Sequence, residues 1–373
     1  MKKARFIYDI SEKNADMFYA TKFRAPDPFI YFELGGKKHA VMNDLEYDRA
    51  RRESCVDKVV RLSPYVERAE KKMKSPGQVD VIHEILSEHG VRLLEVPQDA
   101  PFALMDALRA MGYSVTAGPS PFYPERFVKT AEERRNILKS QRVVFRSISF
   151  ARDVLRSSRI KGKRLVYRGR TLTSESLRSM INIFLLERGF IAPETIVSCG
   201  LHAIDPHDTG SGPLLPHSSI IVDVYPRSQK TFYYGDATRT FCRGRAPEAL
   251  KKMYATVKEG QALGLSMIRA GVEGRRVHEA IHSFFAGRGY ETGEKDGRRQ
   301  GFFHGTGHSI GLEVHEEPLR ITYRDCTLAA GNVMSVEPGL YYKGIGGVRI
   351  EDLVHVTRSG CEILAGFPKV LEV

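Results

Sequence analysis

The chain has 373 residues, 57 of them basic and 45 acidic, which gives a formal net charge of +12 at neutral pH. With 42% hydrophobic and 27% charged residues, the composition is that of a folded globular protein with room for two domains. No apolar run is long enough for a membrane span, and the basic residues are dispersed without interleaved aromatics, which argues against a nucleic-acid partner.

Residues 1–125 alternate strand-like and helix-like segments, a pattern that predicts a small α/β domain with parallel strands. Two of the strands flank a turn at Gly35–Gly36, and no phosphate-binding glycine loop interrupts the pattern. The predicted elements are strands over 28–34, 37–43, 91–96 and 113–116 and helices over 79–88 and 101–111.

A stretch rich in Pro and Gly, AGPSPFYPER at 117–126, is predicted to lead into a second domain over 126–373. Thr130 and Glu133 have the spacing of a capping box, so a long helix is predicted to begin there, with apolar residues at three- and four-residue steps. Three further helices are predicted over 174–187, 248–269 and 276–286.

The segment 218–241 predicts a hairpin that carries two carboxylates. Apolar residues alternate with Asp223 and Tyr225, as in a strand with an acidic group on one face, and the second strand carries Asp236. If the hairpin is symmetric about Gln229–Lys230, the two aspartates face each other with Cβ atoms ~5 Å apart. A cation between them would turn their repulsion into binding.

A second hairpin, over 332–354, repeats this arrangement with Glu337 and Glu351. A register centred on Gly344 sets the two glutamates across from each other. Arg349 shares the strand face of Glu351 and is expected to neutralise and orient the acidic cluster rather than to contact substrate.

Between the two hairpins lies HGTGHSIGLEVHEEP at 304–318, with His304, His308 and His315 separated by glycines. A helix would lose roughly 1 kcal/mol for each of these glycines, so the stretch is predicted to be a Gly-rich turn leading into a short strand over 312–315. Four carboxylates and an imidazole without cysteine suit Mn, Co, Fe or Zn and argue against a structural zinc site.

These blocks, in this order, resemble those of the pita-bread metallopeptidases: aminopeptidase P, prolidase and methionine aminopeptidase. The resemblance covers roughly residues 130–373, and the pattern of 1–125 is similar to the creatinase-like domain of the first two groups. It implies an α+β protein with a pita-bread catalytic domain over 126–373. The implied activity is hydrolysis of the peptide bond preceding proline, by an Xaa-Pro aminopeptidase or dipeptidase with two divalent metal ions, manganese first and Co, Zn or Fe as alternatives.

The resemblance also implies roles for single residues. Asp236 and Glu351 would bridge the two ions, and His315 would hydrogen-bond the substrate or intermediate. Glu337 or a bridging carboxylate would move the proton of the attacking water. The implied metal ligands are Asp223, Asp236, His308, Glu337 and Glu351, and the implied substrate-pocket histidines are His207 and His304.

Two positions depart from the family pattern. Asp223 and Asp236 are two positions further apart than in the family, an even insertion that lengthens the turn without turning either carboxylate to the other face. Arg320, a candidate contact for the C-terminal carboxylate of the substrate, follows the position of the corresponding prolidase arginine, here Leu319. A displaced contact predicts that Xaa-Pro-Yaa peptides are cleaved at least as well as dipeptides, whereas a bulge that returned Arg320 to the pocket would favour dipeptides.

The alternative is a non-peptidase pita-bread protein, either a creatinase-like amidinohydrolase or a metal-free binding module. Those relatives lose the metal ligands, whereas all five positions here carry ligand-competent side chains. The extra N-terminal domain disfavours methionine aminopeptidase.

The expected partners are a peptide with proline at its second position and a second copy of the chain, without nucleic acid or membrane. Five scattered cysteines and an N-terminus without a secretory signal predict a reduced, cytoplasmic protein.

Overall fold

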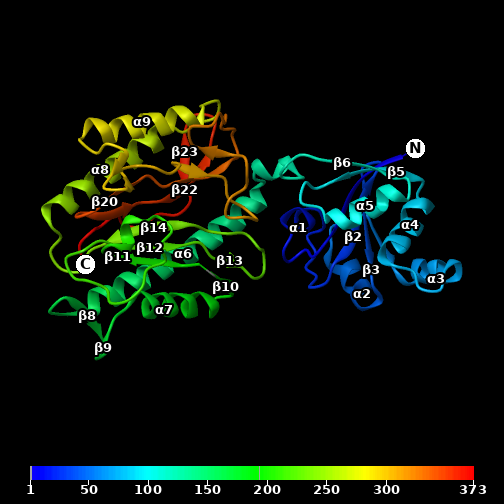
Figure 1. The fold of residues 1–373 in the computed structure, drawn as a ribbon, viewed down its shortest axis with the longest axis horizontal. Helices are drawn as coiled ribbons and strands as arrows, with labels where there is room; N and C mark the ends of the chain where they lie inside the picture. Colours follow the sequence, from blue (N-terminus) through cyan, green and yellow to red (C-terminus); the bar gives the residue numbers. More distant parts are fainter. Residues whose placement is uncertain (1, 193) are drawn as a thin grey trace. The chain divides into compact units, whose positions relative to one another are not determined.

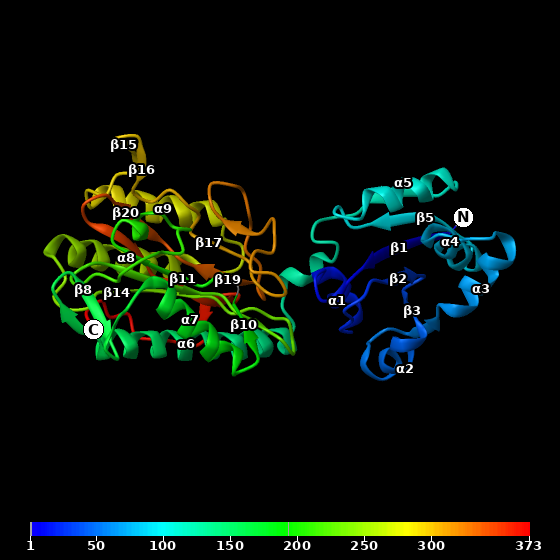
Figure 2. The ribbon, with the colours of Figure 1, turned by 60° about the horizontal axis from the view of Figure 1, so that its bottom comes forward.

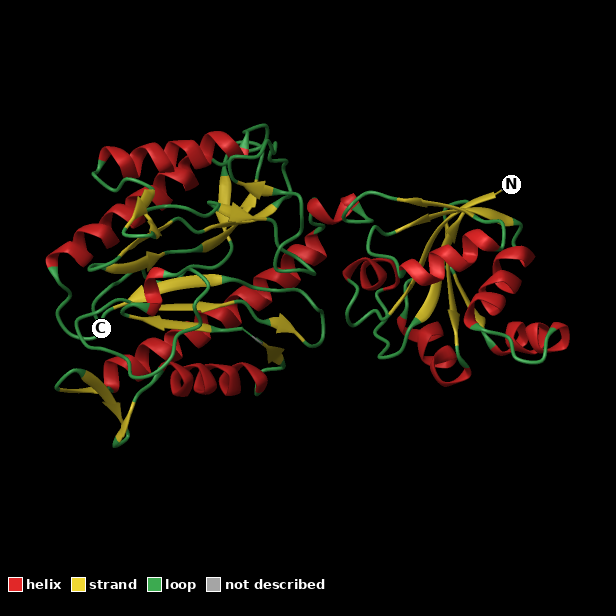
Figure 3. Ribbon diagram, in the orientation of Figure 1, coloured by secondary structure: helices red, strands yellow, loops and turns green. Residues whose placement is uncertain are grey.

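The computed structural model describes residues 2–192 and 194–373 and divides into two compact units, Met1–Arg126 and Phe127–Val373 (Figure 1). Both units combine helices with strands, as the expected α+β class requires (Figure 3). None of the helices in the described residues combines the length and apolar character that a membrane crossing requires.

The N-terminal unit is built on a six-stranded sheet in the order β4-β3-β2-β1-β5-β6. Its strands are β1 (Lys2–Asp9), β2 (Phe29–Leu34), β3 (Lys37–Met42), β4 (Lys58–Arg61), β5 (Val91–Val96) and β6 (Ser114–Ala117). Its helices are α1 (Ala15–Thr21), α2 (Asp44–Glu53), α3 (Ser63–Lys72), α4 (Gln78–Glu88) and α5 (Phe102–Ala110), followed by the 3-10 turn η1 (Pro124–Phe127).

The expectation of parallel strands holds for only part of this sheet. The β1–β5, β5–β6 and β3–β4 pairs are parallel, but β1–β2 and β2–β3 are antiparallel. The antiparallel β2–β3 pair is explained by the turn that joins these two strands, where Gly35 and Gly36 have φ values of 58° and 77°. Such a two-residue turn joins only antiparallel neighbours, because parallel strands need a long crossover.

The C-terminal unit places two helices against each of two groups of strands (Figure 2). The predicted helices form within a few residues of their expected bounds, and the capping box of α6 is made: Thr130 N–H donates to Glu133 Oε2 at 2.9 Å and Glu133 N–H to Thr130 Oγ1 at 3.2 Å. The four helices are α6 (Ala131–Ser157), α7 (Ser174–Leu186), α8 (Glu248–Met267) and α9 (Gly274–Gly287).

The helices α6 and α7 share one hydrophobic core with a three-stranded sheet in the order β11-β12-β14. The helices α8 and α9 share a second core with the sheet β19-β22-β23 and the ribbon β20-β21. The strands of these groups are β11 (Ile196–Cys199), β12 (Ile220–Val224), β14 (Ala237–Phe241), β19 (Val333–Val336), β20 (Gly339–Tyr342), β21 (Gly346–Arg349), β22 (Asp352–Val356) and β23 (Cys361–Ile363).

Shorter elements connect these layers. Among them, β17 pairs with β18 and β10 pairs with β13. These elements are β7 (Arg159–Lys161), β8 (Arg164–Tyr167), β9 (Arg170–Thr171), β10 (Phe190–Ile191), η2 (His202–Ile204), β13 (Arg227–Ser228), β15 (Gly293–Lys295), β16 (Arg298–Gln300), β17 (Gly307–His308) and β18 (Arg320–Ile321).

Hydrogen bonds from backbone N–H groups join the two strand groups directly. Arg349 N–H, at the end of β21, donates to Thr240 Oγ1 of β14 at 3.0 Å, and Glu351 N–H donates to Thr238 O of β14 at 3.1 Å. The acidic residues of both predicted hairpins therefore lie where the two halves of this unit meet.

Candidate metal centre

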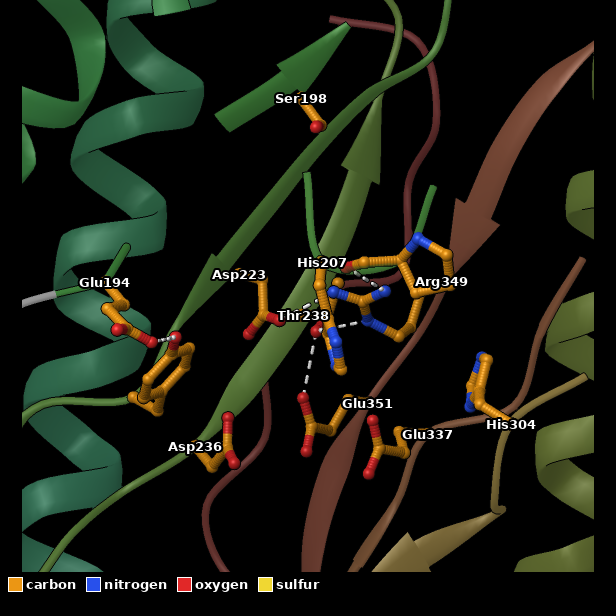
Figure 4. A network of polar contacts seen from close by, with 12 residues as sticks. Glu194, Ser198, His207, Asp223, Asp236, Thr238, His304, Glu337, Arg349 and Glu351 are labelled. Atoms are coloured by element: carbon orange, nitrogen blue, oxygen red, sulfur yellow. Dashed lines mark hydrogen bonds and ion pairs between the residues drawn. The ribbon is translucent and has the colours of Figure 1, made fainter. Parts of the chain in front are cut away.

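The five predicted ligand residues line one cavity of about 510 Å³ within the C-terminal unit, and Figure 4 shows the four carboxylates among them. Ligand atoms of Asp236, His308 and Glu351 all lie within 4.8 Å of one another. His308 Nε2 lies 3.3 Å from Glu337 Oε1 and 3.6 Å from Asp236 Oδ2. The residues that line the cavity also include Asp223, His207, His304, His315 and Arg320.

The first hairpin has a different register from the one expected. Asp223 pairs with Thr238 rather than with Asp236, which immediately precedes β14. The turn is therefore centred one residue later, because β13 within it pairs with β10 and adds a constraint from outside the hairpin. The difference in pairing is two residues, which keeps both aspartates on one face, and both line the cavity.

The second hairpin has the expected register, centred on Gly344. Val336 pairs with Asp352 and Gly339 with Arg349, so Glu337 and Glu351 face each other in a gap between two paired stretches. Their backbone groups bond elsewhere: Glu337 N–H donates to Thr306 O at 2.8 Å, and Glu351 N–H donates to β14 as described above. Both glutamates are thus fixed by neighbouring segments as well as by their own hairpin.

The strand predicted over 312–315 is wrong, because this stretch consists of bends and the strand of the histidine segment is β17. Gly307 explains the position of β17. A Cβ at Gly307 would lie 1.9 Å from the carbonyl oxygen of Ser335, so only glycine allows this strand to approach β19 so closely. His308 follows directly and is held over the acidic residues.

A buried ion pair shapes the bends that replace the predicted strand. Lys129 Nζ pairs with the carboxylate of Glu316, and both side chains are 1% exposed. The same carboxylate accepts the Leu312 N–H at 3.1 Å, while Glu316 N–H donates to Ser309 O at 2.9 Å. The segment is therefore folded back on itself, with His315 next to the clamped residue.

His315 and His304 flank the acidic residues from different sides of the histidine segment. The His315 ring stands edge-to-face against the His308 ring at 4.3 Å between centroids, and His304 Nε2 lies 3.0 Å from the Tyr341 hydroxyl. Burial is the main reason that the pKa of each imidazole falls to about 4, with His308 adding to the effect at His315. Both rings are therefore neutral at pH 7, and His207 lies exposed on the cavity wall.

Arg320 lies on the cavity side and Leu319 faces the core. In the β17–β18 pair Arg320 stands opposite His308, its side chain is 34% exposed, and it forms an ion pair with Glu317. Leu319 packs against the hydrophobic core under α8 and α9. Of the two alternatives that the sequence offers, the structure shows the one that returns Arg320 to the pocket.

Arg349 has the position expected for a neutralising residue. Its Nη2 donates to Asp223 Oδ2 at 2.6 Å and its Nη1 to the Tyr341 hydroxyl at 2.9 Å. Burial still raises the pKa of Asp223, although Arg349 opposes that rise. Burial also raises the pKa values of Asp236 and Glu351 well above their ordinary range, and the neighbouring carboxylates add to both shifts.

Glu337 differs from the other three acids. Burial works against its ionisation too, but its hydrogen bond to His308 and the charge of that ring outweigh burial and lower its pKa to about 2. Three of the four carboxylates are buried and Glu337 is half-buried, and a single arginine, Arg349, is in direct contact with one of the four among the described residues. Such a set is stable in its charged form only when additional positive charge is present.

The donor atoms fit divalent metal ions. Asp223 Oδ1 and Glu351 Oε1 are buried and have no hydrogen-bond partner within residues 2–192 and 194–373. Buried oxygens of this kind are rarely left without a partner, and carboxylate oxygens with one imidazole are ligands that Mn, Co, Fe and Zn accept.

Several residues of the site were not singled out from the sequence. Thr238 Oγ1 donates to Glu351 Oε2 at 2.9 Å, and Tyr341 links His304 to Arg349. Lys129 precedes the capping box and carries no local signal for its distant partner. Tyr225 and Glu194 also line the cavity; Tyr225 shares the strand face of Asp223, which was visible in the alternation.

The model of metallopeptidase family M24 matches residues 141–358 of the chain. Among curated proteins, the uncharacterized peptidase YqhT of Bacillus subtilis is 34% identical over 178 residues, 48% of each chain. The Xaa-Pro dipeptidase of Pyrococcus horikoshii is 33% identical over 172 residues, 46% of each. The aligned part spans about half the length of these relatives.

Solved structures match nearly the whole chain. The X-Pro aminopeptidase of Thermotoga maritima has a TM-score of 0.82 at 21% identity and covers 100% of this chain and 98% of that one. The prolidase of Pyrococcus furiosus has a TM-score of 0.79 at 22% identity and covers 98% and 96%. At such identities these matches establish the fold, and they confirm the expected α+β pita-bread architecture.

Proposed function

Because the chain belongs to metallopeptidase family M24, we propose that it hydrolyses the peptide bond preceding proline with the help of two divalent metal ions. The observation that carries the proposal is the set of four carboxylates and His308 in one cavity, with buried oxygens of Asp223 and Glu351 that lack partners among the described residues. The names of its relatives, Xaa-Pro dipeptidase and X-Pro aminopeptidase, support the substrate class.

In this proposal, Asp223, Asp236, His308, Glu337 and Glu351 would hold the two ions. Asp236 and Glu351 would be shared by both ions, Asp223 would serve one, and His308 with Glu337 would serve the other. Burial and the neighbouring carboxylates raise the pKa values of Asp236 and Glu351 well above their ordinary range, which supports their contact with added positive charge. We propose manganese as the ion, with Co, Zn or Fe as alternatives that the same donors accept.

When bound, two such ions activate a water molecule and polarise the scissile carbonyl. A carboxylate oxygen of Glu337 accepts the proton of that water and returns it to the leaving prolyl nitrogen. His315, neutral at pH 7, donates a hydrogen bond to the oxygen that gains negative charge. His304, held by Tyr341, and His207 line the space for the substrate.

The position of Arg320 also bears on the length of the substrate. Its guanidinium lines the cavity beside His308, where it can meet the carboxylate of a proline at the end of the peptide. Because Arg320 lines the cavity, the position expected to favour dipeptides, we propose that Xaa-Pro dipeptides are the preferred substrates.

The test is hydrolysis of a matched panel of Xaa-Pro and Xaa-Pro-Yaa peptides by protein loaded with Mn²⁺, Co²⁺ or Zn²⁺, together with elemental analysis of bound metal. We expect two metal ions per chain and cleavage before proline only. A protein that retains no metal would point to the non-peptidase alternatives, the creatinase-like amidinohydrolase or the metal-free binding module. A protein that binds both ions but cleaves no peptide before proline would contradict the proposed substrate class.

We also propose a cytoplasmic location and a homodimer. All five cysteines are free thiols, which supports a reducing compartment. The homodimer rests on the resemblance to the family and is tested by light scattering of the purified protein.

A further inference from the structure

One carboxylate in the cavity has no part in the metal site. Glu194 lies two residues before Ile196, the residue of β11 that pairs with Asp223 of β12. Continued by two residues, this antiparallel register sets Glu194 opposite Tyr225, and the Tyr225 hydroxyl donates to Glu194 Oε2 at 3.3 Å. All four residues line the cavity, so this wall presents a carboxylate and a phenol next to the metal ligand Asp223 (Figure 4).

Glu194 is an acid of the cavity that is neither a proposed metal ligand nor part of an ion pair among the described residues. Asp223 pairs with Arg349 and Glu316 with Lys129, whereas Glu194 forms no ion pair with a basic side chain of the described residues. Its side chain is exposed and lines the cavity. It is therefore an available anion at the cavity wall.

The cavity wall carries both an acidic and a basic side chain that a substrate can meet. Figure 4 shows Glu194 beside Asp223 and Asp236, and His304 on the other side of the acidic cluster, past Glu337. Arg320 stands opposite His308 in the β17–β18 pair and lines the same cavity as Glu194. A peptide whose carboxylate meets Arg320 therefore has Glu194 available in that cavity as a partner for a cationic group of its amino-terminal residue.

We propose that Glu194, positioned by Tyr225, is a specificity-determining residue that binds a cationic group of the substrate's amino-terminal residue. This inference rests on the proposed Xaa-Pro peptidase function and deepens it. The cation has two possible sources, the free α-amino group or a basic side chain of Xaa, and both are recognised by the same charge-assisted hydrogen bond. The class of preferred substrates is accordingly Arg-Pro and Lys-Pro, or peptides with a free amino terminus in general.

The experiment compares the wild type with Glu194→Gln on Arg-Pro, Leu-Pro and N-acetyl-Leu-Pro. Loss of a charge-assisted contact costs about tenfold in kcat/KM. If Glu194 binds the side chain, the ratio of kcat/KM for Arg-Pro over Leu-Pro falls about tenfold in the variant. If it binds the α-amino group, Arg-Pro and Leu-Pro lose about tenfold alike, and N-acetyl-Leu-Pro loses less than either.

Glu187→Gln is the matched control, because Glu187 is exposed on the surface beside Arg188 and does not line the cavity. It should leave all three substrates unchanged. Tyr225→Phe, which removes only the hydroxyl that holds Glu194, should reproduce part of the loss. Equal kcat/KM values in the wild type and Glu194→Gln for all three peptides would overturn the inference.

A binding measurement separates this inference from the proposed function. Titration calorimetry of Arg-Pro and Leu-Pro on metal-free protein requires no turnover. If the wild type cleaves no peptide, the proposed function fails, yet the Kd of Arg-Pro or of both peptides still rises about tenfold in Glu194→Gln if Glu194 binds the cation. Unchanged Kd values for both peptides would reject the role of Glu194 independently of any activity.

Discussion

The two hairpins that supply the carboxylates are built in opposite ways. The ladder between β12 and β14 runs through Asp223 without interruption, whereas the ladder that begins with β19 and β22 is open at Glu337 and Glu351. A continuous ladder fixes a side chain by its own strand neighbours. An open one leaves backbone groups that must bond elsewhere, and Glu337 and Glu351 find their partners in Thr306 and Thr238.

Each hairpin also completes the other. Arg349, from the second, neutralises Asp223 of the first, and Thr238, from the first, donates its hydroxyl to Glu351 of the second. The difference in construction shows that neither hairpin forms the site alone. We therefore expect a substitution in one hairpin to change the orientation of the carboxylates in the other.

The largest effect should come from Asp236→Ala, which removes a proposed bridging ligand from the first hairpin. We expect loss of both metal ions and of all detectable hydrolysis. The fold should persist, because burial raises the pKa of Asp236 and its charge opposes folding above the ordinary carboxyl pKa. Metal content and the Tm of the metal-free protein measure both parts of this prediction.

Asp153→Ala is the control for that change, since Asp153 is an exposed carboxylate paired with Arg152 on α6. It should retain two metal ions and full turnover. If Asp236→Ala kept both ions and near-normal activity, the assignment of ligands to the first hairpin would be wrong.

The register of the second hairpin could be predicted from the sequence and that of the first could not, for a physical reason. The second register is centred on Gly344, whose φ of 92° suits glycine, so a local signal in the sequence marks it. The first register depends on β10, which pairs with β13 inside the turn, and such a partner leaves no local trace. The even difference of two residues preserved the face, so both aspartates line one cavity although the predicted pairing was wrong.

The histidine segment shows the same limit. The ligand types and their order were visible in the sequence, but the strand predicted over 312–315 was not formed. The bends there depend on Lys129 and Glu316, which are 187 positions apart. Alternation of side chains describes local geometry only, and a buried ion pair between distant residues overrides it. Arg320 reached the cavity for a related reason, since its face is set by pairing with β17.

The second largest effect should come from His315→Ala, which tests whether the segment between the hairpins serves the reaction rather than the metal. His315 contacts the His308 ring but lies outside the group of ligand atoms. We expect unchanged metal content and a kcat lower by about 10²–10³-fold, the range for loss of one donor to a developing oxyanion. Loss of metal instead would mean that His308 and His315 have exchanged roles.

A smaller effect is expected for Arg349→Lys, which probes the link between the hairpins directly. Lysine keeps the charge but cannot reproduce the fork that joins Asp223 and Tyr341. We expect metal affinity to fall about 10- to 100-fold, as for other residues that orient ligands. Competition with a chelator measures the affinity, and an unchanged value would show that Asp223 is oriented by its own ladder alone.

The smallest effect concerns Arg320, which stands opposite a metal ligand but serves the substrate in the proposed function. Its side chain is 34% exposed and already paired with Glu317, so its contact with a dipeptide carboxylate lies at the weak end of charged hydrogen bonds. Arg320→Ala should raise KM for Xaa-Pro dipeptides about tenfold and change kcat little, with a smaller effect on matched Xaa-Pro-Yaa peptides, whose carboxylate lies further on.

Arg324→Ala is the control, because Arg324 is an exposed arginine of the same segment that does not line the cavity. It should change the KM of neither substrate. A wild type that prefers tripeptides, together with a dipeptide KM that Arg320→Ala leaves unchanged, would mean that the guanidinium lines the cavity without touching the substrate; the carboxylate contact would then have to be sought elsewhere on the cavity wall.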